Sequence, residues 1–229
     1  MYKRILLKLS GEALGNPFDT KVLNDIAKQI KKLVEEGVEV GIVVGGGNIC
    51  RGRTFEKLGL DRRNADYIGM EATVINAQML EASLAKIGVK AKTLSTIDVQ
   101  RVEKYDAEKA NKLLKKKTVC VFGGGTGKPF YSTDTASALR AADINAEVIL
   151  MAKNGVDGVY SADPNVDPSA TKYDELKFDD IIKQELAVID LQAAKICKKN
   201  KIQAFIFDMA VKNNIVKATK GKAVGTIIK

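Results

Sequence analysis

The stretch VEVGIVVGGGNICRG, residues 38–52, places a buried-type strand directly before three consecutive glycines. A second stretch, TVCVFGGGTGKPF at residues 118–130, repeats this arrangement. A third strand-like run, KRILLKLS at residues 3–10, ends in Ser10 and is followed by Gly11. In an open α/β sheet, ligands bind at the carboxyl ends of the strands. Three such tips on neighbouring strands therefore predict one crevice along one edge of a sheet.

The glycine tips indicate a site for phosphate groups. Glycine lets backbone N–H groups come close to phosphate oxygens, and a following helix N-terminus favours negative charge. Each tip also carries a basic residue, namely Lys8, Arg51 or Lys128. A single glycine run could equally do no more than permit a tight turn. The three tips together favour a phosphate site.

Two common nucleotide-binding motifs fit less well. A Walker P-loop needs glycine five residues before Gly127 and Ser or Thr after Lys128, where this chain has Phe122 and Pro129. A Rossmann dinucleotide site needs a G-x-G-x-x-G run after the first strand, and none follows it. Residues 118–130 therefore require another interpretation.

Apolar strand-like runs alternate with amphipathic helical runs, which is typical of an α/β sheet with helices on both faces. Strands are expected at residues 3–10, 38–44, 89–95, 118–122, 147–152, 202–207 and 223–229. Helices are expected at residues 19–36, 64–86, 106–116, 133–145, 178–186 and 191–199, with one more short helix before the last strand. We therefore predict a three-layer α/β/α sandwich with a central, mainly parallel sheet. No segment within residues 1–229 has the composition of a flexible linker, so a single domain is expected.

The composition excludes several classes of site. The chain has no histidine, which removes Ser-His-Asp and Cys-His catalysis and histidine-ligated zinc. Its three cysteines, Cys50, Cys120 and Cys197, form no CxxC pair, which argues for a reducing compartment. No apolar stretch reaches the roughly 18 residues of a membrane span. Residues 1–15 lack the features of a signal peptide, so a cytoplasmic protein with no membrane partner is expected.

The net charge of +9, from 37 basic and 28 acidic residues, has two explanations. The lysine runs near residues 28–32, 112–117 and 195–199 are more typical of solvated helix faces than of a nucleic-acid surface. A small polyanionic substrate would also suit a basic protein. Phosphoryl transfer between phosphate groups fits a chain without histidine. A phosphate monoester, with a second pKa near ~6, is largely ionised at pH 7 and needs no general base.

The motifs together resemble those of the bacterial uridylate (UMP) kinases of the amino acid kinase superfamily. The resemblance rests on YKRILLKLSGEAL, VVGGGNICRG, ADYIGM, GGGTGKPFYSTDTASALRA, NGVDGVYSADP and VIDLQAAKIC, in family order over essentially the whole chain. It implies transfer of the γ-phosphoryl group of ATP, with Mg²⁺, to UMP in pyrimidine nucleotide (CTP) biosynthesis. It also implies a homohexamer, with an acceptor-binding lobe at about residues 1–145 and an ATP-binding lobe at about 146–229.

The resemblance also implies roles for individual residues. ATP would be bound by Lys8, Leu9, Ser10, Gly11, Gly47, Arg51, Asn154, Tyr160 and Asp163. UMP would be bound by Gly46, Asp66, Thr126, Gly127, Lys128, Pro129, Phe130, Tyr131, Ser132 and Thr133. Lys8 would neutralise the transferring group and Arg51 would clamp the phosphates of both nucleotides. Asp190 would orient Lys8, and Asp134 would lie near the phosphates and magnesium.

Four of these residues also have simpler explanations from local structure. Asp66 could be the N-cap of the long helix, and Asp190 could cap the helix that begins at Leu191. Tyr160 could pack on the sheet, and Asp163 before Pro164 is a frequent turn dipeptide.

Two departures from the family pattern affect what the resemblance implies. Lys128 stands where the family usually has Asn, so it adds a charge beside the expected phosphates. The segment EALGNPFDT, residues 12–20, is shorter than the glycine-containing loop of many relatives, so activation by GTP is not expected. Feedback by UTP at the acceptor site is less affected.

Three alternatives remain at the level of sequence. A carbamate, acetylglutamate or glutamate kinase would keep the fold, but the segment from Thr126 to Thr133 argues against it. A nucleotide-sensing regulator that contacts nucleic acid would use the lysine-rich helices, and its affinity for duplex DNA would fall steeply with salt. The set of Lys8, Arg51 and the glycine tips argues for catalysis. A nicotinamide-dependent oxidoreductase fits least well.

Overall fold

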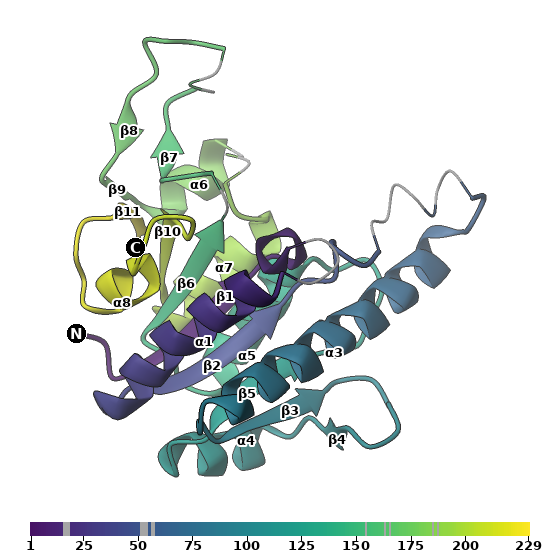
Figure 1. Ribbon diagram of the computed structural model, residues 1–229. Coiled ribbons are helices and arrows are strands. Elements are labelled where there is room, and N and C mark those ends of the chain that lie inside the picture. The colour runs from purple at the N-terminus through teal and green to yellow at the C-terminus, as the bar shows by residue number, and fades with distance from the viewer. Residues whose placement is uncertain are drawn as a thin grey trace.

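A nine-stranded sheet forms the centre of the computed structural model, which describes residues 1–15, 19–50, 55, 58–153, 155–162, 164, 166–184, 186 and 188–229. The strand order is β4-β3-β5-β2-β1-β6-β10-β11-β9 (Figure 1). The strands are β1 (Arg4–Leu9), β2 (Glu39–Val44), β3 (Ala91–Ser95), β4 (Glu103–Lys104), β5 (Val119–Gly123), β6 (Val148–Lys153), β9 (Glu175–Leu176), β10 (Gln203–Asp208) and β11 (Gly225–Ile228). The β10–β11 pair is antiparallel, and the other neighbours in this sheet are parallel. The predicted mainly parallel α/β sheet is confirmed.

Helices cover both faces of this sheet (Figure 1). One layer contains α1 (Thr20–Glu35), α3 (Arg62–Lys86) and α8 (Asn214–Thr219). The other contains α4 (Ala107–Lys115), α5 (Thr133–Asp143), α6 (Phe178–Gln184) and α7 (Leu191–Asn200). A short 3-10 helix, η1 (Gly11–Leu14), follows β1. Each layer packs its apolar side chains on its own face of the sheet, which gives two separate core clusters and the predicted three-layer sandwich.

The alternation of side chains along β1 decides which layer each residue faces. Leu7 and Leu9 belong to the core under α1 and α3, whereas Leu6 belongs to the core under α5 and α7. Because successive side chains of a strand point to opposite faces, Lys8 faces the same layer as Leu6. The sequence of β1 therefore places one lysine under α5, near the carboxyl end of a central strand.

The sheet is continuous across the lobe boundary expected near residue 145. β1, from the first lobe, pairs in parallel with β6, from the second, and Lys8 lies opposite Met151. A separate two-stranded ribbon of β7 (Val159–Tyr160) and β8 (Lys172–Tyr173) extends from the sheet at the top of Figure 1. No helix in the described part of the chain is long and apolar enough to cross a membrane.

The observed elements differ from the expected ones mainly at their ends. The long helix begins at Arg62 rather than Asn64, and its N-cap is Asp61, whose carboxylate accepts from Asn64 N at 3.1 Å. Asp66 therefore lies inside the first turns of α3, so the explanation of Asp66 as an N-cap is wrong. The short strands β4, β7, β8 and β9 were not expected, because two residues are too few to show a period in the sequence.

Candidate active site

The tips of β1 and β2 form a row of free backbone donors at the carboxyl edge of the sheet. The N–H groups of Gly11, Gly46 and Gly47 donate to no other residue in the described part of the chain. The two tips are in close contact, since a Cβ added to Gly11 would lie 2.4 Å from Gly47 N. Free N–H groups close together at the ends of neighbouring strands favour an anion.

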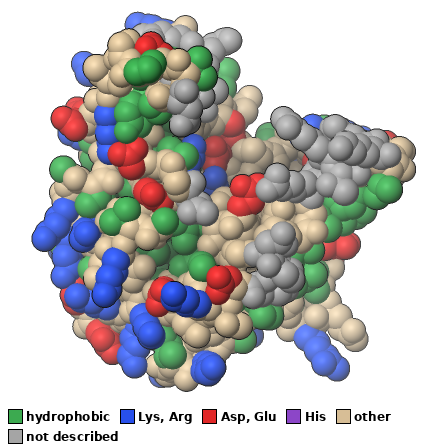
Figure 2. All heavy atoms as spheres, turned by 45° about the horizontal axis from the view of Figure 1, so that its top comes forward, with side chains coloured by type: hydrophobic (Ala, Val, Ile, Leu, Met, Phe, Trp, Pro, Cys, Tyr) green, Lys and Arg blue, Asp and Glu red, His purple; other side chains and the backbone are tan. Residues whose placement is uncertain are grey.

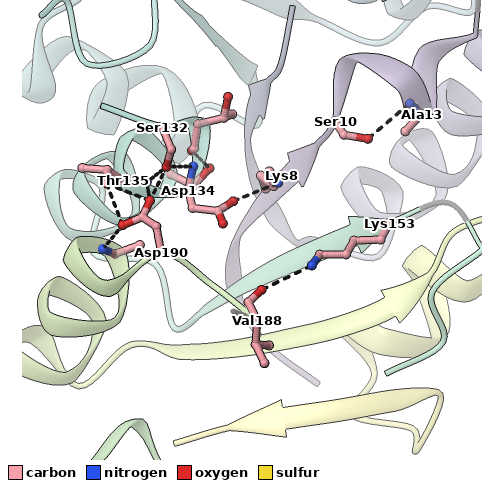
Figure 3. A network of polar contacts seen from close by, with 12 residues as sticks. Lys8, Ser10, Ala13, Ser132, Asp134, Thr135, Lys153, Val188 and Asp190 are labelled. Atoms are coloured by element: carbon pink, nitrogen blue, oxygen red, sulfur yellow. Dashed lines mark hydrogen bonds and ion pairs between the residues drawn. The ribbon is translucent and has the colours of Figure 1, made fainter. Parts of the chain in front are cut away.

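Lys8 is on β1, the strand that leads to Gly11, and its ammonium forms an ion pair with the first turn of α5. Lys8 Nζ is 2.8 Å from Asp134 Oδ1, and both side chains are largely buried (Figure 3). Ser10 caps η1, its Oγ accepting from Ala13 N at 3.3 Å. The side chain of Leu9 is in the core, so Leu9 can offer only its backbone to a ligand.

Asp190 lies close by but does not contact Lys8. Its carboxylate accepts from Ala193 N at 2.8 Å and is the N-cap of α7, as its local sequence also allows. The same carboxylate accepts from Thr135 N at 3.1 Å, from the Thr135 hydroxyl and from the Ser132 hydroxyl (Figure 3). Asp190 thus fixes the start of α5, which carries Asp134. Asp190 is therefore linked to Lys8 indirectly, through the first turn of α5 and Asp134.

A cavity of about 310 Å³ opens between the ends of β2 and β5, and we call it the β2–β5 cavity. Its lining comes from three segments: Gly46, Gly47 and Cys50 after β2; Ala65, Asp66, Gly69, Met70 and Thr73 of α3; and Gly125, Thr126, Lys128, Tyr131, Ser132 and Thr133 after β5. Figure 2, which brings the carboxyl edge forward, shows the surface hollowed between the sheet and the projecting end of α3, with acidic and basic side chains on the walls.

A second cavity, of about 340 Å³, lies between η1, α1 and Met209. The charged residues that line the second cavity, Glu12, Asp19 and Asp25, are all carboxylates, whereas Lys128 lines the β2–β5 cavity, so the second cavity suits phosphate less well.

The sequence-predicted acceptor residues thus lie together, though not all of them face the cavity. Gly127, Pro129 and Phe130 belong to the loop after β5 but are not part of the cavity lining. Phe130 adopts a left-handed backbone conformation with φ 70°, and its ring is exposed. The Phe130 N–H donates to Asp66 Oδ2 at 2.7 Å, while Asp66 Oδ1 pairs with Arg62. Asp66 therefore ties this loop to α3.

Two polar residues of α3 support the cavity and were missed by reasoning from sequence. The Thr73 hydroxyl donates to Met70 O at 2.6 Å and accepts from Gly124 N at 2.7 Å, which joins α3 to the end of β5. The Asn76 amide donates to Gly45 O at 2.6 Å and to Asn48 Oδ1 at 2.7 Å, which joins α3 to the end of β2. Both side chains are buried. Their signal in the sequence is a pair of polar residues three apart in an otherwise apolar helical face.

A second lysine, Lys153, lies at the end of β6 and was also missed. Its ammonium donates to Val188 O at 3.3 Å (Figure 3). Burial lowers the pKa of Lys153 below its usual value, the positive charge of Lys8 lowers it further, and Asp134 partly opposes both effects.

Three expected site residues, Arg51, Asn154 and Asp163, lie outside the described residues. Tyr160 is described in β7, where its hydroxyl donates to Asp157 Oδ1 at 2.9 Å rather than packing only on the sheet. Asp157 also pairs with Lys172 at 2.9 Å across the β7–β8 ribbon.

Known proteins resemble this chain over nearly its whole length. A model of the amino acid kinase family matches residues 3–208. A uridylate kinase of Limosilactobacillus reuteri is 48% identical over 232 residues, which cover 99% of this chain and 97% of that protein. Among solved structures, a UMP kinase from Ureaplasma parvum has a TM-score of 0.95 at 38% identity, with 100% of this chain and 99% of that chain covered. A UMP kinase from Bacillus anthracis has a TM-score of 0.96 at 38% identity, with 100% and 96% covered.

Proposed function

We propose that this chain, which belongs to the amino acid kinase family and within it to the uridylate kinases, transfers the γ-phosphoryl group of ATP to UMP at the carboxyl ends of β1, β2 and β5. One observation carries the assignment of this site. The N–H groups of Gly11, Gly46 and Gly47 are free at the ends of β1 and β2, Gly46 and Gly47 line the β2–β5 cavity, and β1 also carries Lys8 in its ion pair with Asp134.

The strand order supports separate sites for the two substrates, one on each side of β1. The sheet runs β5-β2-β1-β6-β10, so the β2–β5 cavity lies on one side of β1 and the end of β6 on the other. UMP would occupy the cavity, with its phosphate at Gly46 and its nucleoside toward α3 and the loop after β5. ATP would lie over β1 and β6, with its phosphates at Ser10, Gly11 and Gly47. Lys8 on β1 would then stand between the two nucleotides.

The chemistry needs charge neutralisation more than it needs a base. A UMP phosphate oxygen forms a bond to the γ-phosphorus, the bond to the bridging oxygen breaks, and ADP leaves with the electron pair. The UMP phosphate is already largely ionised at pH 7. The barrier comes from bringing two polyanions together, which Lys8, the glycine N–H groups and Arg51 would offset. Asp134 would hold Lys8 in position until the phosphates arrive.

The residues present fit a magnesium ion that arrives with ATP. The described residues contain no group of three or more His, Cys, Asp or Glu side chains that could bind a metal ion. The buried Asp134 Oδ1, apart from its ion pair with Lys8, has no hydrogen-bond partner among them. Kinases usually hold Mg²⁺ by one or two carboxylates together with substrate phosphates. Asp134 would supply that carboxylate, and the ion would neutralise phosphate charge.

The adenosine of ATP would lie toward the β7–β8 ribbon. Tyr160 is held there by its hydrogen bond to Asp157. Asn154 and Asp163, which flank β7 in sequence, would complete this part of the site.

The chain would also associate with itself through α3. Tyr67, Ile75 and Met79 expose large apolar side chains on this one helix, with 42%, 46% and 36% of their surface accessible. An exposed apolar helix face favours an interface. We expect a homohexamer built from dimers, as the family resemblance implies. Ile75→Glu should lower the mass measured by light scattering, whereas Lys28→Glu on α1 should not.

The experiment that tests the function is a coupled assay for ADP release with ATP and Mg²⁺. UMP, CMP, dUMP and carbamate are offered in parallel to the wild-type chain and to Lys8→Ala. Turnover on UMP that Lys8→Ala abolishes is the expected result. Turnover on carbamate without turnover on UMP would overturn the assignment of the β2–β5 cavity.

A further inference from the structure

Lys153 is placed by strand register on the face of the sheet that carries Lys8. Lys8 lies opposite Met151, and Lys153 follows two residues later on the same strand. Side chains two apart on a strand share a face, so Lys153 and Lys8 both point toward α5 and α7. Lys153 stands one step closer to the carboxyl edge, where the glycine tips also lie.

The Lys153 ammonium has few partners for a half-buried charge. In the part of the chain that the structure describes, it makes no ion pair, and its hydrogen bond to Val188 O is long at 3.3 Å. An ammonium has three donors, so two remain available. A half-buried charge with one weak hydrogen bond is costly in the free protein.

The nearby carboxylates are occupied elsewhere. Asp134, on α5, pairs with Lys8. Asp190, before α7, accepts from residues of α5 and α7. Asp208, opposite Lys153 on β10, accepts from Gly155 N at 3.1 Å and Ala210 N at 2.8 Å. Lys153 is therefore left without a carboxylate partner among the described side chains, and the lowered pKa of Lys153 is consistent with this half-buried position beside Lys8.

The position of Lys153 on β6 also determines which of the two nucleotides it can contact. β6 lies on the opposite side of β1 from β2, so Lys153 is separated from the β2–β5 cavity by the strand that carries Lys8. An anion at Lys153 would be the donor nucleotide rather than the acceptor.

We propose that Lys153 is a second catalytic lysine, which binds the β-phosphate of the donor and neutralises the charge that develops there as the bond to the γ-phosphorus breaks. This inference rests on the proposed function. Lys8 would neutralise the phosphoryl group in transit, and Lys153 the departing ADP. The electron pair of the broken bond ends on the oxygen that Lys153 faces.

The test compares Lys153→Met, which keeps the length of the side chain without its charge, with Lys153→Arg and with Lys195→Met on the exposed side of α7. For Lys153→Met, kcat should fall about 100-fold or more, since removing one donor to a developing charge has that effect. The KM for UMP should stay within about 2-fold, because the change lies on the donor side. Lys153→Arg should recover part of kcat, and Lys195→Met should match the wild type.

A second readout does not depend on turnover. Without nucleotide, Lys153→Met should unfold at the same temperature as the wild type or higher, because a poorly partnered buried charge is removed. The rise in Tm that saturating ADP causes should shrink in Lys153→Met and remain in Lys195→Met. A purely structural role for Lys153 would instead lower the Tm of the free protein and leave the ADP effect unchanged.

An unchanged kcat in Lys153→Met, or a change confined to the KM for UMP, would overturn the proposal. If the wild type does not phosphorylate UMP at all, the proposed function fails, and the ADP-dependent rise in Tm still decides whether Lys153 binds the donor.

Discussion

The Lys8 ammonium on β1 and the Asp134 carboxylate on α5 lie 2.8 Å apart in a largely buried ion pair. The pair joins a central strand to the helix that follows the β2–β5 cavity. The strand residue that we propose binds phosphate is thereby held in place by the first turn of that helix.

Asp134→Asn should reduce kcat about 100-fold, because Lys8 loses the group that positions it. It should also lower the free energy of unfolding by about 1–3 kcal/mol, since a buried donor is left without its charged partner. Both effects are measured by steady-state kinetics and urea unfolding. Asp179→Asn is the control, since Asp179 pairs with Lys198 at an exposed position on α6. Equal kcat in the two variants would contradict the role given to Asp134.

Gly11→Ala should abolish ATP binding and destabilise the fold. The new Cβ would lie 2.4 Å from Gly47 N and 2.9 Å from Asn48 N, so backbone atoms would have to move. Gly47→Ala is the matched comparison for stability, because its Cβ would find its nearest neighbour, a Glu12 atom, at 3.8 Å. Thermal unfolding should show a lower Tm for Gly11→Ala and an unchanged Tm for Gly47→Ala. Equal Tm values would show that the two strand tips are not in close contact.

The glycine tips could be predicted from sequence because their signal is local, a buried strand followed at once by glycine. The partner of Lys8 could not. Asp134 and Asp190 both stand at the start of helices α5 and α7, and only the packing of α5 across β1 decides which one reaches the lysine. Lys153 was missed for a similar reason. Its place beside Lys8 depends on the register between β1 and β6, which are separated by more than a hundred residues.

Asp66→Ala should raise the KM for UMP about 10-fold or more and leave kcat nearly unchanged. The carboxylate holds the loop after β5 through Phe130 N at 2.7 Å and lines the cavity where the nucleoside of UMP is proposed to bind. Losing hydrogen bonds to a charged acceptor has about this effect on binding. Arg62→Ala, which removes the exposed partner of Asp66 and keeps the Phe130 hydrogen bond, should have little effect on KM. Amide hydrogen exchange at Phe130 should become faster in Asp66→Ala alone, and equal exchange in both variants would contradict the role of Asp66 in holding the loop.

Lys128→Asn should raise the KM for UMP by about 2- to 5-fold, as expected for an exposed charge that attracts a phosphate across water. Lys128 lines the β2–β5 cavity, and the Thr126 hydroxyl fixes its backbone by donating to Lys128 O at 2.9 Å. The effect should shrink at high salt, because exposed charges are screened. Lys115→Asn on the exposed end of α4 is the control. A KM that does not respond to Lys128→Asn at low salt would show that this side chain projects away from the substrate.

Tyr105 should make the fold sensitive to alkaline pH. Its hydroxyl donates to Asp143 at 2.7 Å, and the Arg140 guanidinium lies 3.8 Å above its ring. Burial, followed by this hydrogen bond, raises the pKa of Tyr105 well above its usual value. Below about pH 10 the phenol is neutral in both the folded and the unfolded chain, so the stability that the buried, neutral Tyr105 contributes is fully present. Above that pH the unfolded chain releases the proton while the folded chain retains it, so the free energy of unfolding falls as pH rises.

Urea unfolding between pH 9 and 11 measures this effect. The free energy of unfolding should fall less steeply with pH in Tyr105→Phe than in the wild type, by up to about 1.4 kcal/mol per pH unit, the value for one proton. At pH 8 the variant should be less stable by about 1 kcal/mol, because the hydrogen bond to Asp143 is lost. Parallel pH dependence in the two proteins would show that Tyr105 ionises as readily in the folded chain as in the unfolded one. The contacts of Tyr105 with Arg140 and Asp143 would then not favour the protonated phenol in the folded chain.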